Sequence, residues 1–219
     1  MTNPLKAKYL VLLAALSCGG KKSEQNPTPT PTAPLPTAGI AGQRVALMPL
    51  ALVGAEEALQ WDALIGERRA TLDKSDSIIA TLLGARAPEV TWVGPAELRH
   101  IARRAPGIAP DPDQMGTPFL RASNIVDVPD PIRSQLRTLM GLAGGRYVLV
   151  PAGLVFRVRV ANPGATPRGP GHLAVAELSV VMIDSRIGRI GWRTIARGEG
   201  DDPWTALSRA VKSLTPGLP

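Results

Sequence analysis

Residues 145–160, GRYVLVPAGLVFRVRV, constrain the fold of this 219-residue chain more than any other stretch. The first part, YVLV, is continuously apolar and rich in β-forming residues, which is typical of a strand buried on both faces of a sheet. Further along, Arg157 and Arg159 alternate with apolar residues, and this period of two indicates one buried face and one face in water. We therefore predict one long strand that starts in the core and runs out to an exposed edge.

Pro151 and Gly153 stand where the pattern of this strand changes. Proline cannot donate a hydrogen bond to a neighbouring strand, and glycine has no side chain to pack. The pair therefore predicts a bulge or a kink within one continuous strand. The alternative is two short strands joined by a turn at these residues.

The segments around this strand carry the apolar periods of helices and shorter strands. A helical period predicts helices at residues 75–86, 95–104, 132–142 and 202–214. Ser75 or Asp76 is the expected N-cap of the first of these helices. Runs of β-forming residues predict strands at 44–50 and 90–93, then a hairpin of residues 173–184 and 189–197. The predicted fold class is α/β: a mixed β-sheet with a C-terminal antiparallel hairpin and helices packed on it.

Residues 105–131 are rich in proline and show no apolar period. Irregular loops of this length are usually functional or disordered, and a loop stiffened by proline loses less conformational entropy when it docks. We therefore expect a partner to bind this loop or the outer end of the long strand, where Arg157 and Arg159 lie. The alternative is that the loop is disordered filler and that the two arginines only keep the strand soluble.

The N-terminus has the pattern of an export signal, which we assign to residues 1–17. Lys6 and Lys8 supply positive charge, and residues 9–16, YLVLLAAL, form a short apolar segment. A helix that spans a bilayer needs about 20 apolar residues, so this segment is too short to span and instead fits a signal peptide.

Residues 15–18, Ala-Leu-Ser-Cys, resemble the lipobox of bacterial lipoproteins. The resemblance implies cleavage between Ser17 and Cys18 and acylation of Cys18, which anchors the chain to a membrane. Cys18 is the single cysteine of the chain, so it cannot form an internal disulfide. Gly19 follows it, with no Asp there to resemble an inner-membrane retention signal, which favours the outer membrane. The alternative is an ordinary secretory signal that is cut nearby.

Residues 18–42 are assigned to a flexible tether that carries the lipid, and residues 43–216 to the folded domain. Prolines alternate with small polar residues in the tether, and residues 19–39 show no apolar period, so we expect none of them to be buried. Chains rich in proline adopt an extended conformation of about 3.1 Å per residue. The tether would hold the domain away from the lipid surface.

Charge and composition argue against nucleic acid as a partner. The formal charge is +7, but the basic residues are spread along the chain and aromatic residues make up only 4% of it. Proteins that bind single-stranded nucleic acid combine a positive groove with aromatic stacking platforms, and this sequence does not show them.

No constellation of residues points to an enzyme, a cofactor or a metal. His100 and His172 are far apart in the sequence. The loop carboxylates do not have the spacing of a calcium-binding EF-hand; they are Asp111, Asp113, Asp127 and Asp130. Residues 141–145, GLAGG, lack the Lys-Ser/Thr of a phosphate-binding loop, and the end of a helix explains their glycines.

Taken in order, several segments resemble the family around the TolB N-terminal domain, the curli lipoprotein CsgG and the penicillin-binding-protein activator LpoB. The segments are residues 44–50, RVALMPL; 90–101, VTWVGPAELRHI; 144–154, GGRYVLVPAGL; and 178–192, LSVVMIDSRIGRIGW. The resemblance implies an α/β domain that binds other envelope proteins and has no shared catalytic residues.

The expected function is a non-catalytic protein-interaction module, anchored by lipid in the cell envelope, facing the periplasm and binding another envelope protein. One alternative is a subunit of a secretion or assembly complex like CsgG. Membrane strands would need about 9–11 residues with alternating apolar faces, whereas the insert at 161–171 is short and full of glycine and proline. The other alternative is an enzyme whose site cannot be recognised in the sequence.

Overall fold

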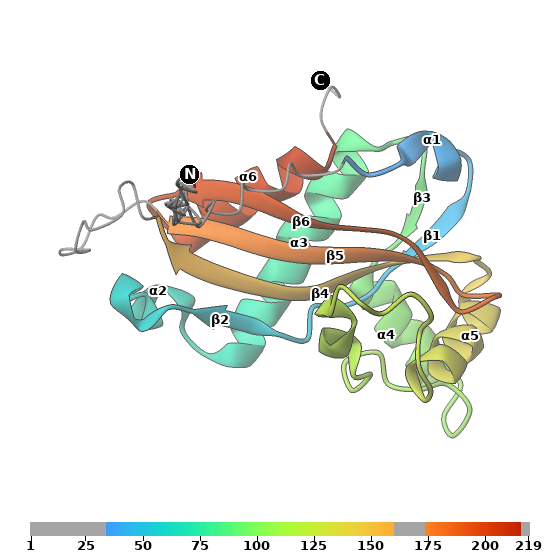
Figure 1. Cartoon of the computed structure of the whole chain (residues 1–219). Coiled ribbons are helices and arrows are strands. Elements are labelled where there is room, and N and C mark those ends of the chain that lie inside the picture. Colours follow the sequence, from blue (N-terminus) through green and yellow to red (C-terminus); the bar gives the residue numbers. More distant parts are fainter. Residues whose placement is uncertain (1–33, 160–173, 216–219) are drawn as a thin grey trace, which may run out of the picture. The chain divides into compact units, whose positions relative to one another are not determined.

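The computed structural model describes residues 34–159 and 174–215. These residues form one sheet with the strand order β3-β1-β4-β5-β6 (Figure 1). Strand β2 is not part of this order and pairs with β4. The strands are β1 Arg44–Leu47, β2 Val53–Ala55, β3 Thr91–Val93, β4 Tyr147–Val158, β5 Ala174–Asp184 and β6 Arg189–Gly200. The helices are α1 Thr37–Ile40, η1 Glu57–Leu59, α2 Asp62–Ile65, α3 Arg68–Arg86, α4 Pro95–Arg104, η2 Thr117–Arg121, α5 Ile132–Ala143 and α6 Pro203–Leu214.

The sheet is mixed, and this confirms the predicted fold class. β1 pairs in parallel with β3 and β4, and β2 also runs parallel to β4. β4, β5 and β6 pair antiparallel, and the pairing of β5 with β6 confirms the predicted C-terminal hairpin. Gly188, in the turn of this hairpin, has a φ of 71°, a conformation that suits glycine.

Strand β4 is continuous, with a shift in its register against β5 between Pro151 and Gly153. The predicted bulge is therefore confirmed, and the alternative of two strands joined by a turn is wrong. The prediction of an exposed edge is also wrong, because β4 has β1 and β2 on one side and β5 on the other. A period of two shows which face of a strand is buried, but it does not show whether other strands pair with its two edges. It could therefore not predict the position of β4 within the sheet.

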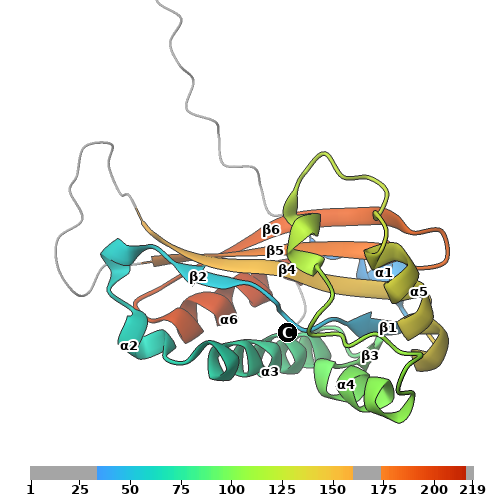
Figure 2. The same cartoon turned by 90° about the horizontal axis from the view of Figure 1, so that it is seen from below.

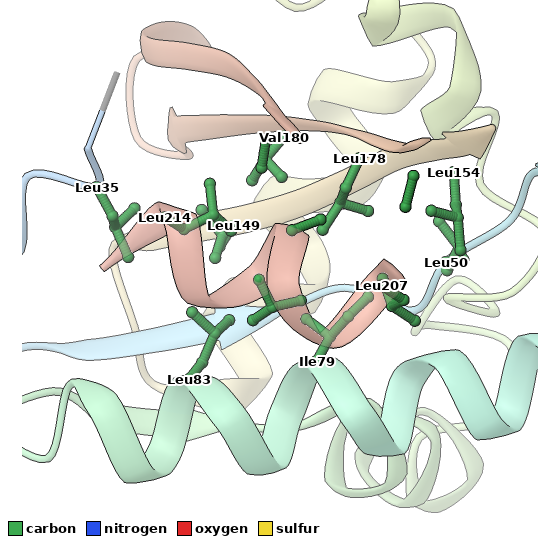
Figure 3. Close-up of a cluster of buried hydrophobic side chains, with 14 of the residues drawn as sticks. Leu35, Leu50, Ile79, Leu83, Leu149, Leu154, Leu178, Val180, Leu207 and Leu214 are labelled. Carbon is green, nitrogen blue, oxygen red and sulfur yellow. The ribbon is translucent and has the colours of Figure 1, made fainter. Parts of the chain in front are cut away.

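Alternate residues of β4 enter two hydrophobic clusters, one on each face of the sheet. Leu149, Leu154 and Phe156 belong to the cluster under α3 and α6, shown in Figure 3. Val148 and Val150 belong to the cluster under α5 and the 105–131 segment. Figure 2 shows α3 and α6 on one side of the sheet and α5 on the other. The burial of the first half of β4 on both faces confirms the expectation from its continuous apolar run.

Helix α6 lies unusually close to β6, and glycine makes this approach possible. A Cβ atom at Gly198 would overlap backbone atoms of Ala206 and Ala210. Asp202 caps the helix and accepts hydrogen bonds from the backbone N–H groups of Trp204 at 2.9 Å and Thr205 at 3.0 Å. The apolar face that α6 buries is thus held against the sheet by small residues on both elements.

Helix α3 begins earlier than the sequence predicts. Its N-cap is Glu67, whose carboxylate accepts hydrogen bonds from the backbone N–H groups of Arg69 and Ala70. Ser75 and Asp76 lie inside the helix and are buried, so their assignment as N-cap residues is wrong. The inward face of the first turns of α3 carries polar residues. These turns therefore lack the apolar period by which a helix is recognised in a sequence.

The 105–131 segment packs against one face of the sheet. It contains η2, and it buries Met115, Leu120 and Val128 in the cluster under α5. Asp127 forms a β-bridge with Arg189 at the start of β6. The alternative that this loop is disordered filler is therefore wrong, and its deletion would expose one face of the core.

The residues just before β1 also pack on the domain. Leu35 and Ile40 are buried, and the backbone N–H of Leu35 donates a hydrogen bond to the carbonyl oxygen of Leu214 at 2.7 Å. The expectation that no residue of 19–39 is buried is wrong for Leu35. Single apolar residues among prolines carry no period, so the sequence could not reveal this contact.

Candidate partner-binding surface

One face of the sheet is only partly covered by the described residues. Helix α5 and η2 lie over the half near the start of β4, whereas no described helix lies over the half near its end (Figure 2). The side chains there alternate with buried ones on each strand and are partly or fully exposed. We call this surface the open face; it consists of Val155, Arg157, Val175, Glu177, Ser179, Ile195, Arg197 and Glu199.

A chain of ion pairs crosses the open face. Arg157 on β4 donates from Nε to Oε2 of Glu177 on β5 at 2.8 Å, and from Nη1 to Oε1 of Glu56 at 3.1 Å. The other oxygen of Glu177, Oε1, accepts from Nε of Arg197 on β6 at 3.0 Å. Glu56 lies just after β2, and its second oxygen accepts the backbone N–H of Val158 at 2.9 Å. These contacts link four segments of the chain across the sheet.

The ion pairs favour the charged forms of Glu177 and Arg157. Burial alone would raise the pKa of the Glu177 carboxyl, but hydrogen bonds from Arg157 and Arg197 outweigh it and the pKa is lowered. The pKa of the Arg157 guanidinium is raised by its hydrogen bonds to Glu177 and then Glu56. The open face therefore presents a constant pattern of charges at neutral pH.

The structure brings the two arginines predicted from the sequence to the same end of the sheet. Arg159 follows β4 and pairs through Nη1 with Oε2 of Glu199 on β6 at 3.0 Å. Both arginines thus contact glutamates of the domain itself, which the sequence analysis did not predict. Their partners are distant in the sequence, and only the pairing of β4, β5 and β6 brings them together.

Apolar side chains lie between and beside the charges. Ile195 is 42% exposed on the open face, and Phe119 of the neighbouring η2 helix is 61% exposed. The η2 segment is fixed to β6 by Arg193, whose guanidinium donates to the carbonyl oxygens of Ala122 and Ile125. Aromatic residues and arginine are both enriched in protein interfaces.

The exposed ion pairs order the side chains of the open face but contribute little to the stability of the fold. Exposed ion pairs contribute about 0–1 kcal/mol each to folding. Held between two carboxylates, however, Arg157 has little side-chain freedom left to lose when a partner docks. The open face is therefore a preorganised surface with fixed charge and some apolar area.

A second polar network is buried between α3, α4 and the 105–131 segment, and the sequence analysis missed it. The guanidinium of Arg99 contacts Oδ2 of Asp76 at 2.7 Å and binds both oxygens of Asp113, at 2.7 and 2.8 Å. Asp76 also accepts the backbone N–H of Leu50 at 2.8 Å. The side chain of Arg99 is only 16% exposed.

Burial raises the pKa of Asp76 to about 6, although the hydrogen bonds from Leu50 and Arg99 act to lower it. The pKa of Asp113 is lowered, first by its hydrogen bonds from Arg99. Arg99 also lies 3.6 Å from Oδ1 of Asp73, and Oδ2 of Asp113 lies 3.5 Å from Nη1 of Arg69. Of the two carboxylates that Arg99 hydrogen-bonds, the more exposed Asp113 receives the bidentate contact. We interpret this network as structural, because it joins α3 to α4 and to the cover of the sheet.

The structure gives no metal-binding or membrane-spanning element in residues 34–159 and 174–215. No group of three or more His, Cys, Asp and Glu side chains there could hold a metal ion. Within the same residues, no helix has the length and apolar character needed to cross a bilayer. His100 is exposed on α4. Ser17, Cys18 and His172 lie outside the described residues.

The chain is similar to several solved structures. No protein-family model and no curated protein matches the chain. The LpoB C-terminal domain from Salmonella enterica matches with a TM-score of 0.36 and 12% identity over 73% of this chain and 83% of its own. The PelC dodecamer from Paraburkholderia phytofirmans gives a TM-score of 0.36 and 15% identity over 85% of this chain and 96% of its own.

A lipoprotein from Neisseria meningitidis gives a TM-score of 0.35 and 14% identity over 72% of this chain and 83% of its own. All three TM-scores lie below 0.5. The three proteins include LpoB, which the sequence resemblance names, but neither TolB nor CsgG, so those two parts of the resemblance receive no support from them.

Proposed function

We propose that this chain is a lipid-anchored, non-catalytic protein-interaction module of the cell envelope, and that the open face is its binding surface. In this proposal residues 1–17 are removed as a signal peptide, Cys18 carries the lipid, and the domain faces the periplasm from the outer membrane. The observation that carries the proposal is the partly covered sheet face, on which Arg157 and Glu177 are already ordered.

The proposed partner is an envelope protein that meets both the charges and the apolar side chains. A partner surface would cover Ile195 and Phe119, whose exposed area is unfavourable in water. It would also meet the chain of arginines and glutamates, which would set the register and the orientation of docking. The tether would allow the domain to search a region near the membrane and raise its effective concentration around fixed partners.

Site-specific photo-crosslinking in intact cells tests this proposal. A photoreactive residue at Ser179 would sit in the middle of the open face, and one at Ser77, exposed on α3, provides a matched control on a different element. We expect one defined protein adduct from position 179 and none from position 77.

A second variant ties the adduct to the open face. Ile195→Glu places a charge among the apolar side chains of the binding surface and should lower the yield of the adduct from position 179. If both positions give the same adducts, or if Ile195→Glu leaves the yield unchanged, the binding surface lies elsewhere.

A further inference from the structure

A hollow rimmed by arginine lies at the opposite end of β4 from the open face. It has a volume of about 530 Å³ and lies between the start of β1, the end of α5 and the hairpin turn of β5 and β6. Its lining includes four arginines and no acidic residue; the arginines are Arg44, Arg137, Arg146 and Arg186. In Figure 1, α5 and the turn between β5 and β6 lie at the same end of the sheet.

Two of these arginines are matched by carboxylates and two are not. Arg44 pairs with Glu97 at 2.9 Å, and Arg146 pairs with Asp184 at 2.5 Å. Within the described residues, the guanidinium of Arg137 donates only to the backbone carbonyl oxygen of Arg186, at 3.1 Å.

The guanidinium of Arg186 has no hydrogen-bond or ion-pair partner among residues 34–159 and 174–215. The rim of the hollow therefore carries positive charge that no carboxylate of the described chain neutralises.

The end of α5 does not account for this excess. A helix C-terminus carries about half a negative charge, which is less than the charge of one arginine. Gly141 and Gly144 also line the hollow, and a Cβ atom at either position would meet nothing within 4 Å. The floor of the hollow is thus left open at backbone level, and a ligand could approach it closely.

We propose that this hollow binds a phosphate monoester group. Guanidinium groups bind phosphate oxygens in a bidentate manner, and a phosphate monoester carries about two negative charges at neutral pH, which match the two arginines without carboxylates. The hollow is larger than one phosphate and has room for the group that the phosphate is attached to. The phosphate comes from a lipid headgroup or from a soluble phosphoester, and the same contacts would bind either.

Nuclear magnetic resonance of the full chain in maltoside micelles tests the proposal. The signals to follow are the Nε–H groups of Arg137 and Arg186, during titration with glycerol 3-phosphate and, separately, with phosphatidate added to the micelles. We expect saturable shifts at both arginines. Shifts with phosphatidate alone would identify the lipid as the source, and shifts with glycerol phosphate would show that the soluble group suffices.

Arg186→Gln should weaken binding about tenfold, because it removes a charge-assisted contact without touching a buried group. Arg104→Gln is the matched control, since Arg104 is exposed like Arg186 but lies in the last turn of α4 and does not line the hollow. If neither phosphate shifts the two signals at millimolar concentration, or if Arg104→Gln weakens binding as much as Arg186→Gln, the proposal is wrong.

Discussion

Replacing Arg99 by methionine should be among the most destabilising single changes at a charged residue of this domain. Methionine keeps the apolar stem of the side chain and removes the charge that pairs with Asp73, Asp76 and Asp113. Asp76, which is 5% exposed, would lose the one guanidinium that contacts it among residues 34–159 and 174–215. Removing one member of a buried ion pair costs about 3–5 kcal/mol, and we expect a loss in this range above pH 7.

The cost of Arg99→Met should depend on pH in a defined direction. The folded chain keeps the Asp76 proton up to about pH 6, whereas the unfolded chain releases it around 3.8. Unfolding therefore releases a proton in this window, and the contribution of Asp76 to stability is lost as the pH rises through 6.

Without Arg99 the pKa of Asp76 rises further, and each additional unit costs about 1.4 kcal/mol above both pKa values and nothing below them. Arg99→Met should therefore cost less at about pH 5 than at about pH 8.

Urea denaturation followed by circular dichroism at these two pH values measures the effect. Arg104→Met, on the exposed side of the same helix, should change the free energy of unfolding by less than about 0.5 kcal/mol at either pH. The reasoning is refuted if Arg99→Met costs less than about 1 kcal/mol at pH 8, or if its cost is the same at both pH values.

Three further outcomes are expected. Gly198→Ala should lower the free energy of unfolding in urea by about 3 kcal/mol, because its methyl group would push α6 from β6; Gly191→Ala, on the same strand with open space, should change it by less than about 0.5 kcal/mol. The free energy of unfolding should fall between about pH 4 and pH 6, and Asp76→Asn should remove that slope; an unchanged slope would assign it to other groups. Mass spectrometry of the protein purified from its native membrane should find Cys18 acylated at the new N-terminus, and an unmodified Cys18 would contradict this.

Much of the fold could be predicted because its signals are local. These signals are the continuous apolar run of β4, the change of pattern at Pro151 and Gly153, and the turn at Gly188. Each of them involves residues that are close together in the sequence. The cap at Asp202 is of the same kind, since it contacts N–H groups two and three residues away.

Several of the missed features depend on contacts between distant segments. Asp76 is tolerated inside α3 because Leu50 and Arg99, far away in the sequence, satisfy its carboxylate. The place of β4 inside the sheet depends on its pairing with β1 and β2, about which its own residues say nothing.

The candidate surface was predicted in part. Alternation along one strand identified Arg157, but its two partners lie on β5 and after β2. Phe119 could not be identified from the sequence, because nothing in the 105–131 segment shows which of its apolar residues remain exposed after the loop packs. Exposure of a loop residue is a property of the assembled fold.

The most direct test of the central claim is whether the open face is covered in living cells. The chain has one cysteine, Cys18, so a cysteine introduced at Ile195 can be labelled selectively with a thiol reagent once Cys18 is acylated. The account predicts that Ile195→Cys reacts more slowly in intact cells than in the purified protein, while Ser77→Cys on α3 reacts at the same rate in both. If the two introduced cysteines are slowed equally, or if neither is slowed, no partner occupies the open face and the proposed function is contradicted.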